Sequence, residues 1–285
     1  MLPPLQVGKY SLDWKDCPYL MGIINVTPDS FSDGGEALTV KQALEKAEAL
    51  LAEGALILDI GGESTRPFAK PVPEDEEIKR VIPVIKAIRE HFPEAIISID
   101  TYKAKVAELA LSKGADMVND ISGAQYEPKI VDVLKDFNCP YVLMHIKGTP
   151  QDMQINPHYD NLLEEMKNYF KERIDWLTTK GVSFEKIIID PGIGFGKTFQ
   201  HNITILKNLK EFKEFNRPLL LGPSRKAFIG EIIQKPPKER DAGTVGVALF
   251  SYLQGVHFLR VHRVSLVKDA LETFKYLLGN RELGC

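Results

Sequence analysis

Cysteine is scarce in this 285-residue sequence, which has only Cys17, Cys139 and Cys285 and no CxxC pair. An odd number of widely spaced cysteines predicts neither a disulfide framework nor a zinc site, so a reducing compartment, the cytoplasm, is the default location. The first residues show neither a charged segment followed by an apolar core nor an Arg-rich amphipathic pattern, so no targeting signal is expected. No apolar run approaches the roughly 20 residues of a membrane-spanning helix, and no membrane partner is expected.

An excess of charge of one sign is also lacking, since 36 Lys and Arg residues nearly balance 39 Asp and Glu residues. Without a basic field, a nucleic-acid partner is not expected, and an anionic substrate must be met by a local group of cations. No Ser/Gly-rich linker or low-complexity run divides the sequence. Because α/β barrels of about 250 residues are common single domains, we expect one domain over residues 1–285, with residues 1–18 as an N-terminal hairpin or extension.

What the sequence does have is a repeated pattern in which a buried apolar run ends in polar residues. Residues 56–67, LILDIGGESTRP, show it most fully, and it recurs at Asp100, Asn119, Asp190, Lys226, Arg260 and His262. About eight such runs alternate with helical patterns, which predicts an α/β protein with the (β/α)8 fold, the TIM barrel. A doubly wound sheet is the runner-up, but it usually has fewer strands and a GxGxxG turn after the first one, which is not found here.

Hydrophobic periodicity locates the expected elements along the chain. Strands are expected over residues 19–26, 56–60, 96–100, 116–119, 141–145, 187–190, 219–222 and 257–261. Helices are expected over 39–53, 73–91, 104–113, 128–137, a long stretch around 163–177, 201–212, 226–233, 241–253 and 266–278. Residues 5–14 suit a small hairpin that plugs the bottom of the barrel. Pro83 predicts a kink or a late start in the second helix.

Asp100, Asn119 and Asp190 each stand at the tip of an expected strand. A single residue of this kind is more often a helix cap or a turn residue. Three such tips at one barrel mouth favour a functional role, because barrel active sites lie on that face. Carboxylates and an amide carbonyl suit adjacent N–H donors, such as the 2-aminopyrimidinone edge of a pterin or guanine. Paired carboxylates in a barrel also occur in glycoside hydrolysis.

Cations gather at the same mouth, which has few aromatic residues that would stack on a sugar. They are Arg66, Lys226, Arg260 and His262. Barrels bind phosphate at the loops after the seventh and eighth strands, where Lys226 and Arg260 stand. The simpler reading of these two residues is a surface ion pair, but an arginine that ends the buried run HFL favours the phosphate site.

The glycine-rich stretch DPGIGFGKT, residues 190–198, is not a P-loop, because Pro191 stands where that motif requires glycine. We interpret it as a flexible loop that presents Phe195 beside Asp190. His145 is interpreted as a core histidine rather than a metal ligand, since no HxxxH pattern or facial triad accompanies it.

Motifs spread in order over nearly the whole chain resemble the dihydropteroate synthase family. They are MGIINVTPDSFSDGG (21–35), DIGGESTRP (59–67), SIDT (98–101), VNDISG (118–123), LMHIKGTP (143–150), DPGIGFGKT (190–198), GPSRK (222–226), RDAGT (240–244) and RVH (260–262). The first two are specific to the family, whereas the later ones are partly shared with pterin-binding methyltransferases.

The resemblance implies condensation of 6-hydroxymethyl-7,8-dihydropterin pyrophosphate with 4-aminobenzoate to 7,8-dihydropteroate in folate synthesis, with Mg²⁺ and a dissociative, SN1-like loss of pyrophosphate. It implies pterin binding by Asp100, Asn119, Asp190, Lys226 and Arg260. It implies pyrophosphate binding by Asn25, Arg66, Arg260 and His262, with Mg²⁺ near Asn25. It implies binding of aminobenzoate, and of competing sulfonamides, by Phe31, Thr65, Pro67, Phe195 and Ser224. The catalytic residues implied are Asp100, Lys226, Arg66 and Asn25.

Three residues depart from the family pattern. Phe68 stands where glycine is usual, so the loop over residues 63–71 is expected to close differently. Pro223 is expected to stiffen the end of the seventh strand, and Arg263 to make the diphosphate end more basic. Closure of loops 25–35 and 63–71 would exclude water from the site.

Two other functions fit much of the pattern. A pterin-dependent methyltransferase has a similar barrel but no need for the motifs at residues 65–67 and 224–226. A non-catalytic pterin-binding protein would need no leaving-group contacts such as Asn25 and Arg66. The family is usually dimeric through late helices, and we expect Phe250, Tyr252 and Leu253 to be exposed apolar positions at a homodimer contact.

Overall fold

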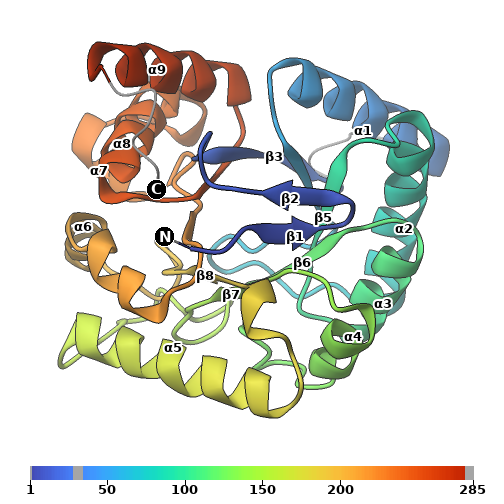
Figure 1. Cartoon of the computed structure of the whole chain (residues 1–285), viewed down its shortest axis with the longest axis horizontal. Helices are drawn as coiled ribbons and strands as arrows, with labels where there is room; N and C mark the ends of the chain where they lie inside the picture. Colours follow the sequence, from blue (N-terminus) through green and yellow to red (C-terminus); the bar gives the residue numbers. More distant parts are fainter. Residues whose placement is uncertain (1, 28–34, 280–285) are drawn as a thin grey trace.

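The computed structural model describes residues 2–27 and 35–279, and its centre is a barrel of eight parallel strands surrounded by helices (Figure 1). The strands neighbour one another in the order β8-β7-β6-β5-β4-β3-β10-β9. A parallel bridge between Ile189 and Leu219 joins the two ends of this order, and the predicted TIM barrel is confirmed. The strands are β3 (Tyr19–Asn25), β4 (Ile57–Gly61), β5 (Ile96–Asp100), β6 (Met117–Asp120), β7 (Tyr141–Met144), β8 (Ile187–Asp190), β9 (Leu220–Leu221) and β10 (Phe258–Val261).

Helices follow the strands along the chain and form the outer layer of the molecule (Figure 1). The α-helices are α1 (Gly35–Ala52), α2 (Glu74–His91), α3 (Ala104–Ser112), α4 (Ile130–Phe137), α5 (Leu162–Thr179), α6 (Phe199–Lys207), α7 (Ala227–Ile233), α8 (Asp241–Gln254) and α9 (Val264–Leu277). Short 3-10 helices are η1 (Phe184–Lys186), η2 (Leu209–Phe215) and η3 (Pro237–Glu239).

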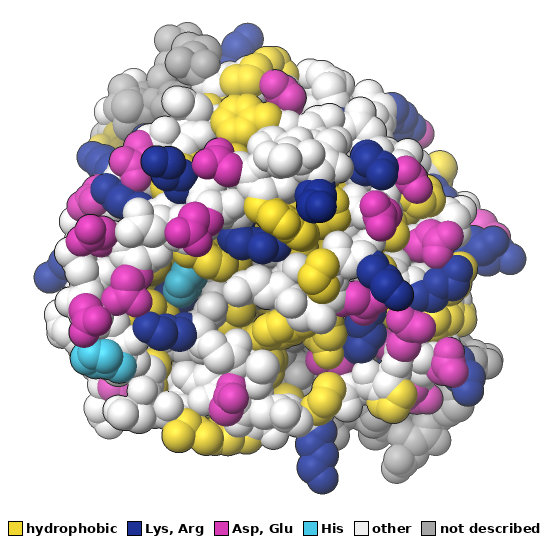
Figure 2. All heavy atoms as spheres, turned by 90° about the horizontal axis from the view of Figure 1, so that it is seen from below, with side chains coloured by type: hydrophobic (Ala, Val, Ile, Leu, Met, Phe, Trp, Pro, Cys, Tyr) yellow, Lys and Arg dark blue, Asp and Glu magenta, His cyan; other side chains and the backbone are white. Residues whose placement is uncertain are grey.

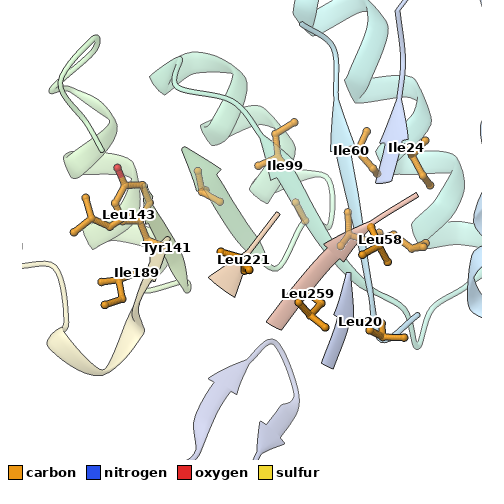
Figure 3. Packing of buried hydrophobic residues seen from close by; sticks show 14 of the residues in the cluster. Leu20, Ile24, Leu58, Ile60, Ile99, Tyr141, Leu143, Ile189, Leu221 and Leu259 are labelled. Atoms are coloured by element: carbon orange, nitrogen blue, oxygen red, sulfur yellow. The ribbon is translucent and has the colours of Figure 1, made fainter. Parts of the chain in front are cut away.

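The strand side chains alternate between the barrel interior and the helical layer, as the two-residue period of a strand requires. The outward set packs with the helices in a large apolar cluster. Leu58, Ile60 and Ile99 are three members of this cluster that Figure 3 labels. The inward set begins with an apolar floor of one residue from each strand: Met21, Ile57, Ile96, Met117, Val142, Ile188, Leu220 and Phe258. Two residues further along, several strands place a polar residue inward, so the barrel changes from an apolar floor to a polar mouth.

The predicted N-terminal hairpin is present and covers the apolar floor. Strands β1 (Leu5–Val7) and β2 (Tyr10–Leu12) pair antiparallel and share a buried cluster with the floor residues. Trp14 adds an edge-on contact to Phe258, with 5.7 Å between ring centroids. Since the hairpin closes the lower end of the barrel, the interior opens toward the carboxyl ends of the strands.

Four local expectations are wrong. The second helix does not start late at Pro83, because α2 already begins at Glu74 and contains Pro83 in its interior; a kink there stays a prediction. The helix expected over 201–212 is divided into α6 and the 3-10 helix η2, and α1 begins four residues before the expected 39. Tyr252 is 5% exposed because it faces α9, one position off the face that Phe250 and Leu253 share.

The cysteines and the surface complete the description. Cys139 has a free, buried thiol, whereas Cys17 is disulfide-bonded, which the wide cysteine spacing did not predict. Within residues 2–27 and 35–279, no helix combines the length and apolarity needed to cross a membrane. On the face seen in Figure 2, Lys and Arg side chains are interspersed with Asp and Glu.

Candidate active site

The centre of the barrel mouth is an arginine held between two carboxylates. Arg260 of β10 donates from Nε to Asp59 Oδ2 at 2.5 Å and from Nη2 to Asp100 Oδ2 at 2.8 Å. Asn119 of β6 donates from Nδ2 to the same Asp59 oxygen at 3.2 Å. Asp59, Asn119 and Arg260 stand two residues above the apolar floor on their strands, and Asp100 stands four above it. The strand period therefore brings four polar side chains to one place.

Asp59 is the residue of this cluster that the site prediction missed. Its side chain is fully buried, and its Oδ1 atom finds no hydrogen-bond partner in the described part of the chain. An unpartnered buried carboxylate oxygen costs free energy, so the position requires an explanation other than packing. The only signal in the sequence was a single charged residue inside the apolar run LILDI.

Burial changes the ionisation of the groups at the mouth. Desolvation raises the pKa of Asp100 to about 7, although Arg260 acts in the opposite direction. Desolvation likewise raises the pKa of Asp190 to about 6, against the N–H of Gly192, which donates to Asp190 Oδ1 at 2.8 Å. For Arg260, burial lowers the pKa, but Asp59 and Asp100 outweigh burial and the net shift is upward. The guanidinium is therefore a permanent cation of the site.

Lys226 approaches this cluster from the loop after β9. Its Nζ lies 4.0 Å from the centroid of the Phe195 ring, which belongs to the loop after β8. Burial and the nearby Arg260 lower the pKa of Lys226 to about 8, while Asp190 and Asp100 act to raise it. The predicted group of Asp100, Asp190, Lys226, Arg260 and Phe195 is thus brought together at one mouth.

Ser224 and His262 form a hydrogen-bonded pair on the same side of the mouth. The Ser224 Oγ atom lies 2.8 Å from His262 Nδ1 and accepts from the His262 backbone N–H at 3.2 Å. Burial, together with Arg260, lowers the pKa of His262 to about 3, so its imidazole is neutral. The two residues that the resemblance assigned to different substrates are in direct contact.

The GPSRK turn is fixed in place by the RDAGT motif of α8. Arg225 adopts a left-handed φ of 61° and forms a two-bond pair with Asp241, at 2.7 and 2.9 Å. The Arg225 backbone N–H donates to Thr244 Oγ1 at 3.0 Å, and Arg240 donates to the Arg225 carbonyl at 3.2 Å. Arg225 therefore supports the turn that carries Ser224 and Lys226 rather than facing a substrate.

The loop after β4 carries the other predicted residues and is anchored by Glu63. Its carboxylate accepts from the Val72 N–H at 2.8 Å, from Lys103 Nζ at 2.7 Å and from the Tyr102 hydroxyl at 3.0 Å. Lys103 also pairs with the buried Glu77. Beyond this anchor the loop reaches the surface: Thr65 is half-buried, and Arg66, Pro67 and Phe68 are exposed.

Two further residues were predicted for the site, Asn25 and Phe31. Asn25 ends β3, is half-buried, and lies beside Gly61 in the strand register. Phe31, and with it most of the expected 25–35 loop, lies outside the described residues.

The three departures from the family pattern are all accommodated. Phe68 keeps a left-handed φ of 65°, a conformation that favours the usual glycine, and its ring is 67% exposed. Pro223 is buried, and its carbonyl accepts the Lys226 N–H at 3.0 Å, which closes a tight turn. Arg263 is exposed at the start of α9, next to His262.

Comparison with known proteins bears directly on this site. A family described as "Pterin binding enzyme" matches residues 21–262. The dihydropteroate synthase of Synechocystis is 49% identical over 263 residues, which are 92% of this chain and 91% of that protein. The chain belongs to the dihydropteroate synthase family.

Solved structures of the family superpose on nearly all of the chain. The Yersinia pestis dihydropteroate synthase in a sulfonamide drug complex has a TM-score of 0.91 at 39% identity, covering 97% of this chain and 99% of that one. The Xanthomonas albilineans enzyme in complex with 7,8-dihydropteroate has a TM-score of 0.87 at 38% identity, with 97% and 99% covered. The chain is thus a transferase of this family with the family's barrel.

Proposed function

We propose that this protein condenses 6-hydroxymethyl-7,8-dihydropterin pyrophosphate with 4-aminobenzoate, giving 7,8-dihydropteroate and pyrophosphate for folate synthesis. The observation that carries the proposal is the Arg260 guanidinium held by Asp59 and Asp100 at the barrel mouth. The family membership and the 7,8-dihydropteroate bound to the Xanthomonas relative support it.

The acceptor groups at the mouth suit the pterin ring. Asp190 of β8 and Asn119 of β6 offer oxygen atoms from the two strands that flank β7, and such acceptors match the neighbouring N–H groups of the pyrimidine edge. Asp190 already accepts from the Gly192 N–H, so its carboxylate is oriented before the substrate arrives. Arg260 is fixed at two of its nitrogen atoms and presents a flat guanidinium on which the pterin ring can stack.

Loss of pyrophosphate requires positive charge near the leaving oxygen. The C–O bond of the pterin methylene breaks with both electrons going to that oxygen. The Arg66 side chain is exposed and makes no hydrogen bond or ion pair within residues 2–27 and 35–279, so its guanidinium is available for the diphosphate. His262 is neutral, and in the tautomer whose Nδ1 accepts from Ser224 its Nε2–H can donate to the diphosphate.

Asn25 fits a magnesium ion that arrives with the diphosphate. Among the described residues, no group of three or more His, Cys, Asp or Glu side chains could hold a metal ion. Mg²⁺ commonly keeps several waters and uses substrate phosphate oxygens, so one amide oxygen from Asn25 suffices as a protein ligand. When bound there, Mg²⁺ would neutralise charge on the departing pyrophosphate.

The electron-poor methylene left on the pterin is stabilised by the carboxylate of Asp100, in an SN1-like step. The nitrogen lone pair of 4-aminobenzoate then forms the new C–N bond, and the resulting ammonium loses a proton to solvent. Thr65, Pro67, Phe195 and Ser224 are proposed to hold the aromatic amine in line with the methylene. No oxidant or reductant takes part.

A pyrophosphate-release assay tests the proposal. We expect release to require 4-aminobenzoate in the wild type, and to fall by about a hundredfold or more in Lys226→Ala and Asp100→Asn. Lys86→Ala and Asp132→Asn, exposed residues on α2 and α4, are the matched controls and should leave the rate unchanged. Pterin binding without any pyrophosphate release would instead support a methyltransferase or a silent binder.

The homodimer and the cytoplasmic location remain predictions. Phe250 and Leu253 on α8 are 39% and 44% exposed, and Tyr276 and Leu277 on the adjacent α9 are both 76% exposed. Paired substitution of Phe250 and Leu253 by Ser should convert a dimer to a monomer in sedimentation velocity.

A further inference from the structure

Lys197, in the loop after β8, is a buried lysine that makes no ion pair within residues 2–27 and 35–279, and burial lowers its pKa to about 7, although the charge of Asp190 acts to raise it. Its side chain is 2% exposed, and its Nζ donates to the carbonyl oxygens of Phe195 at 2.9 Å and His145 at 3.2 Å. The His145 Nδ1 atom lies 3.0 Å from the same Nζ. Lysine is rarely buried unless it is paired, so three neutral acceptors around one ammonium group indicate a specific task.

The acceptors come from two loops that touch through their backbones. A Cβ atom on Gly192 would lie 2.0 Å from the His145 carbonyl oxygen, and one on Gly196 would lie 2.2 Å from the Lys147 carbonyl oxygen. Such contacts leave no room for a side chain, so the glycine-rich loop rests directly on the loop after β7. The Lys197 ammonium group links both loops at this contact.

His145 serves this arrangement as a neutral acceptor. Burial, together with the charge of Lys197, lowers the pKa of His145 well below its usual range. Its ring packs edge-on against Tyr169, with 4.8 Å between ring centroids, which fixes the imidazole plane. When Lys197 is protonated, His145 Nδ1 and the two carbonyl oxygens use all three of its N–H bonds.

Further hydrogen bonds connect the loop after β7 to the loops after β8 and β4. The Tyr159 hydroxyl donates to the Gly196 carbonyl at 2.9 Å, and Gln154 donates to the Gly194 carbonyl at 2.8 Å. On its other side, the loop after β7 accepts the Phe68 N–H at the Pro150 carbonyl, at 2.8 Å. The loop over residues 145–161 thus joins the two loops that carry Pro67 and Phe195.

We propose that Lys197 is a positioning residue for the second substrate, the aromatic amine: by holding the Phe195 carbonyl against the loop after β7, it sets where the Phe195 ring stands beside Lys226. Lys197 contacts no substrate itself. The inference rests on the proposed function, because Phe195 is placed in the aminobenzoate pocket there. It extends that function to a group that the reaction does not use.

The test separates positioning from simple support of the fold. In Lys197→Met, we expect KM for 4-aminobenzoate to rise about tenfold or more, while KM for the dihydropterin pyrophosphate changes less than about twofold. Lys197→Gln keeps two N–H donors for the carbonyl oxygens and should recover part of the loss. Thermal melting is followed for every variant, and Lys197→Gln decides the question if Lys197→Met does not fold.

A double-mutant cycle with Phe195→Ala identifies the route of the effect. If Lys197 acts through Phe195, substituting Lys197 in the Phe195→Ala background should add little to KM for 4-aminobenzoate. Additive effects, equal increases in both KM values, or unchanged KM values in a folded variant would overturn the inference. A wild-type protein that releases no pyrophosphate would instead refute the proposed function, and sulfonamide binding by calorimetry would then test Lys197 without turnover.

Discussion

The hydroxyl group of Ser224 and the Nδ1 atom of His262 lie 2.8 Å apart and share a hydrogen bond, which joins the proposed aminobenzoate and diphosphate sites. One hydrogen bond therefore touches the binding of both substrates. When Nδ1 accepts from Ser224, the proton of the neutral His262 ring is on Nε2, where it can meet a phosphate oxygen.

Ser224→Ala should therefore impair both substrates. Removing the hydroxyl group leaves His262 Nδ1 without its partner, a loss of about 1 kcal/mol, so kcat/KM for each substrate is expected to fall about fivefold to tenfold. Steady-state kinetics with each substrate varied in turn checks this. If kcat/KM changes only for 4-aminobenzoate, Ser224 does not orient His262.

We expect Asp59 to contribute both to stability and to pterin binding, although it was not among the predicted site residues. Asp59→Ala leaves Arg260 with one carboxylate in place of two, and breaking a buried ion pair costs about 3 kcal/mol or more of unfolding free energy. Pterin binding should also weaken, because Arg260 and Asn119 both lose a partner. Urea unfolding and a pterin titration measure the two effects, with Asp132→Ala as the surface control. Unchanged pterin affinity would show that Arg260 is oriented by Asp100 alone.

The pH dependence of the free enzyme follows from three shifted groups. Burial raises the pKa of Asp100 to about 7 and of Asp190 to about 6, and it lowers the pKa of Lys226 to about 8. The carboxylates are protonated below their pKa values, and Lys226 is neutral above its own. Hence kcat/KM for the pterin substrate should decline below about pH 7 and again above about pH 8.

A matched variant assigns the basic limb of that profile. In Lys226→Arg the guanidinium stays charged, so any remaining activity should extend to higher pH. A basic limb that does not move in this variant would mean that a group other than Lys226 is responsible.

Phe68 provides a test of backbone strain. At a φ of 65°, a residue with a Cβ atom is less stable than glycine by about 1 kcal/mol. Phe68→Gly should therefore unfold at a higher urea concentration than Phe68→Ala, and the comparison is clean because the Phe68 ring is largely exposed. Equal stability of the two variants would show that the loop after β4 relaxes out of this conformation.

Most of the barrel was predictable because each strand is a buried apolar run followed by a polar tip. Asp100, Asp190 and Lys226 could be assigned to one mouth from that pattern, since parallel strands end on the same side. Asp59 could not be recognised, because inside the run LILDI it looks like part of a core strand and its partner Arg260 is 201 residues away.

Contacts between loops could not be predicted either, because their partners are far apart in the sequence. Lys197 stood in a glycine-rich stretch that suggested a flexible loop, whereas its ammonium group is fixed by carbonyl oxygens of two loops. Tyr252 was misplaced by one helical position, because hydrophobicity alone does not show which face of α8 meets α9. Long-range hydrogen bonds determine these details, and they have no local signature.

The closure of the barrel has a consequence for its internal dynamics. Strand β9 has two residues, and only the bridge between Ile189 and Leu219 connects it to β8. Asp190 ends β8 and Lys226 lies in the loop after β9, so the narrowest seam of the sheet lies next to two groups proposed to bind the pterin. Amide protons along that seam should exchange with deuterium sooner than those between β3 and β4, and a bound pterin should slow their exchange by tying the two edges together.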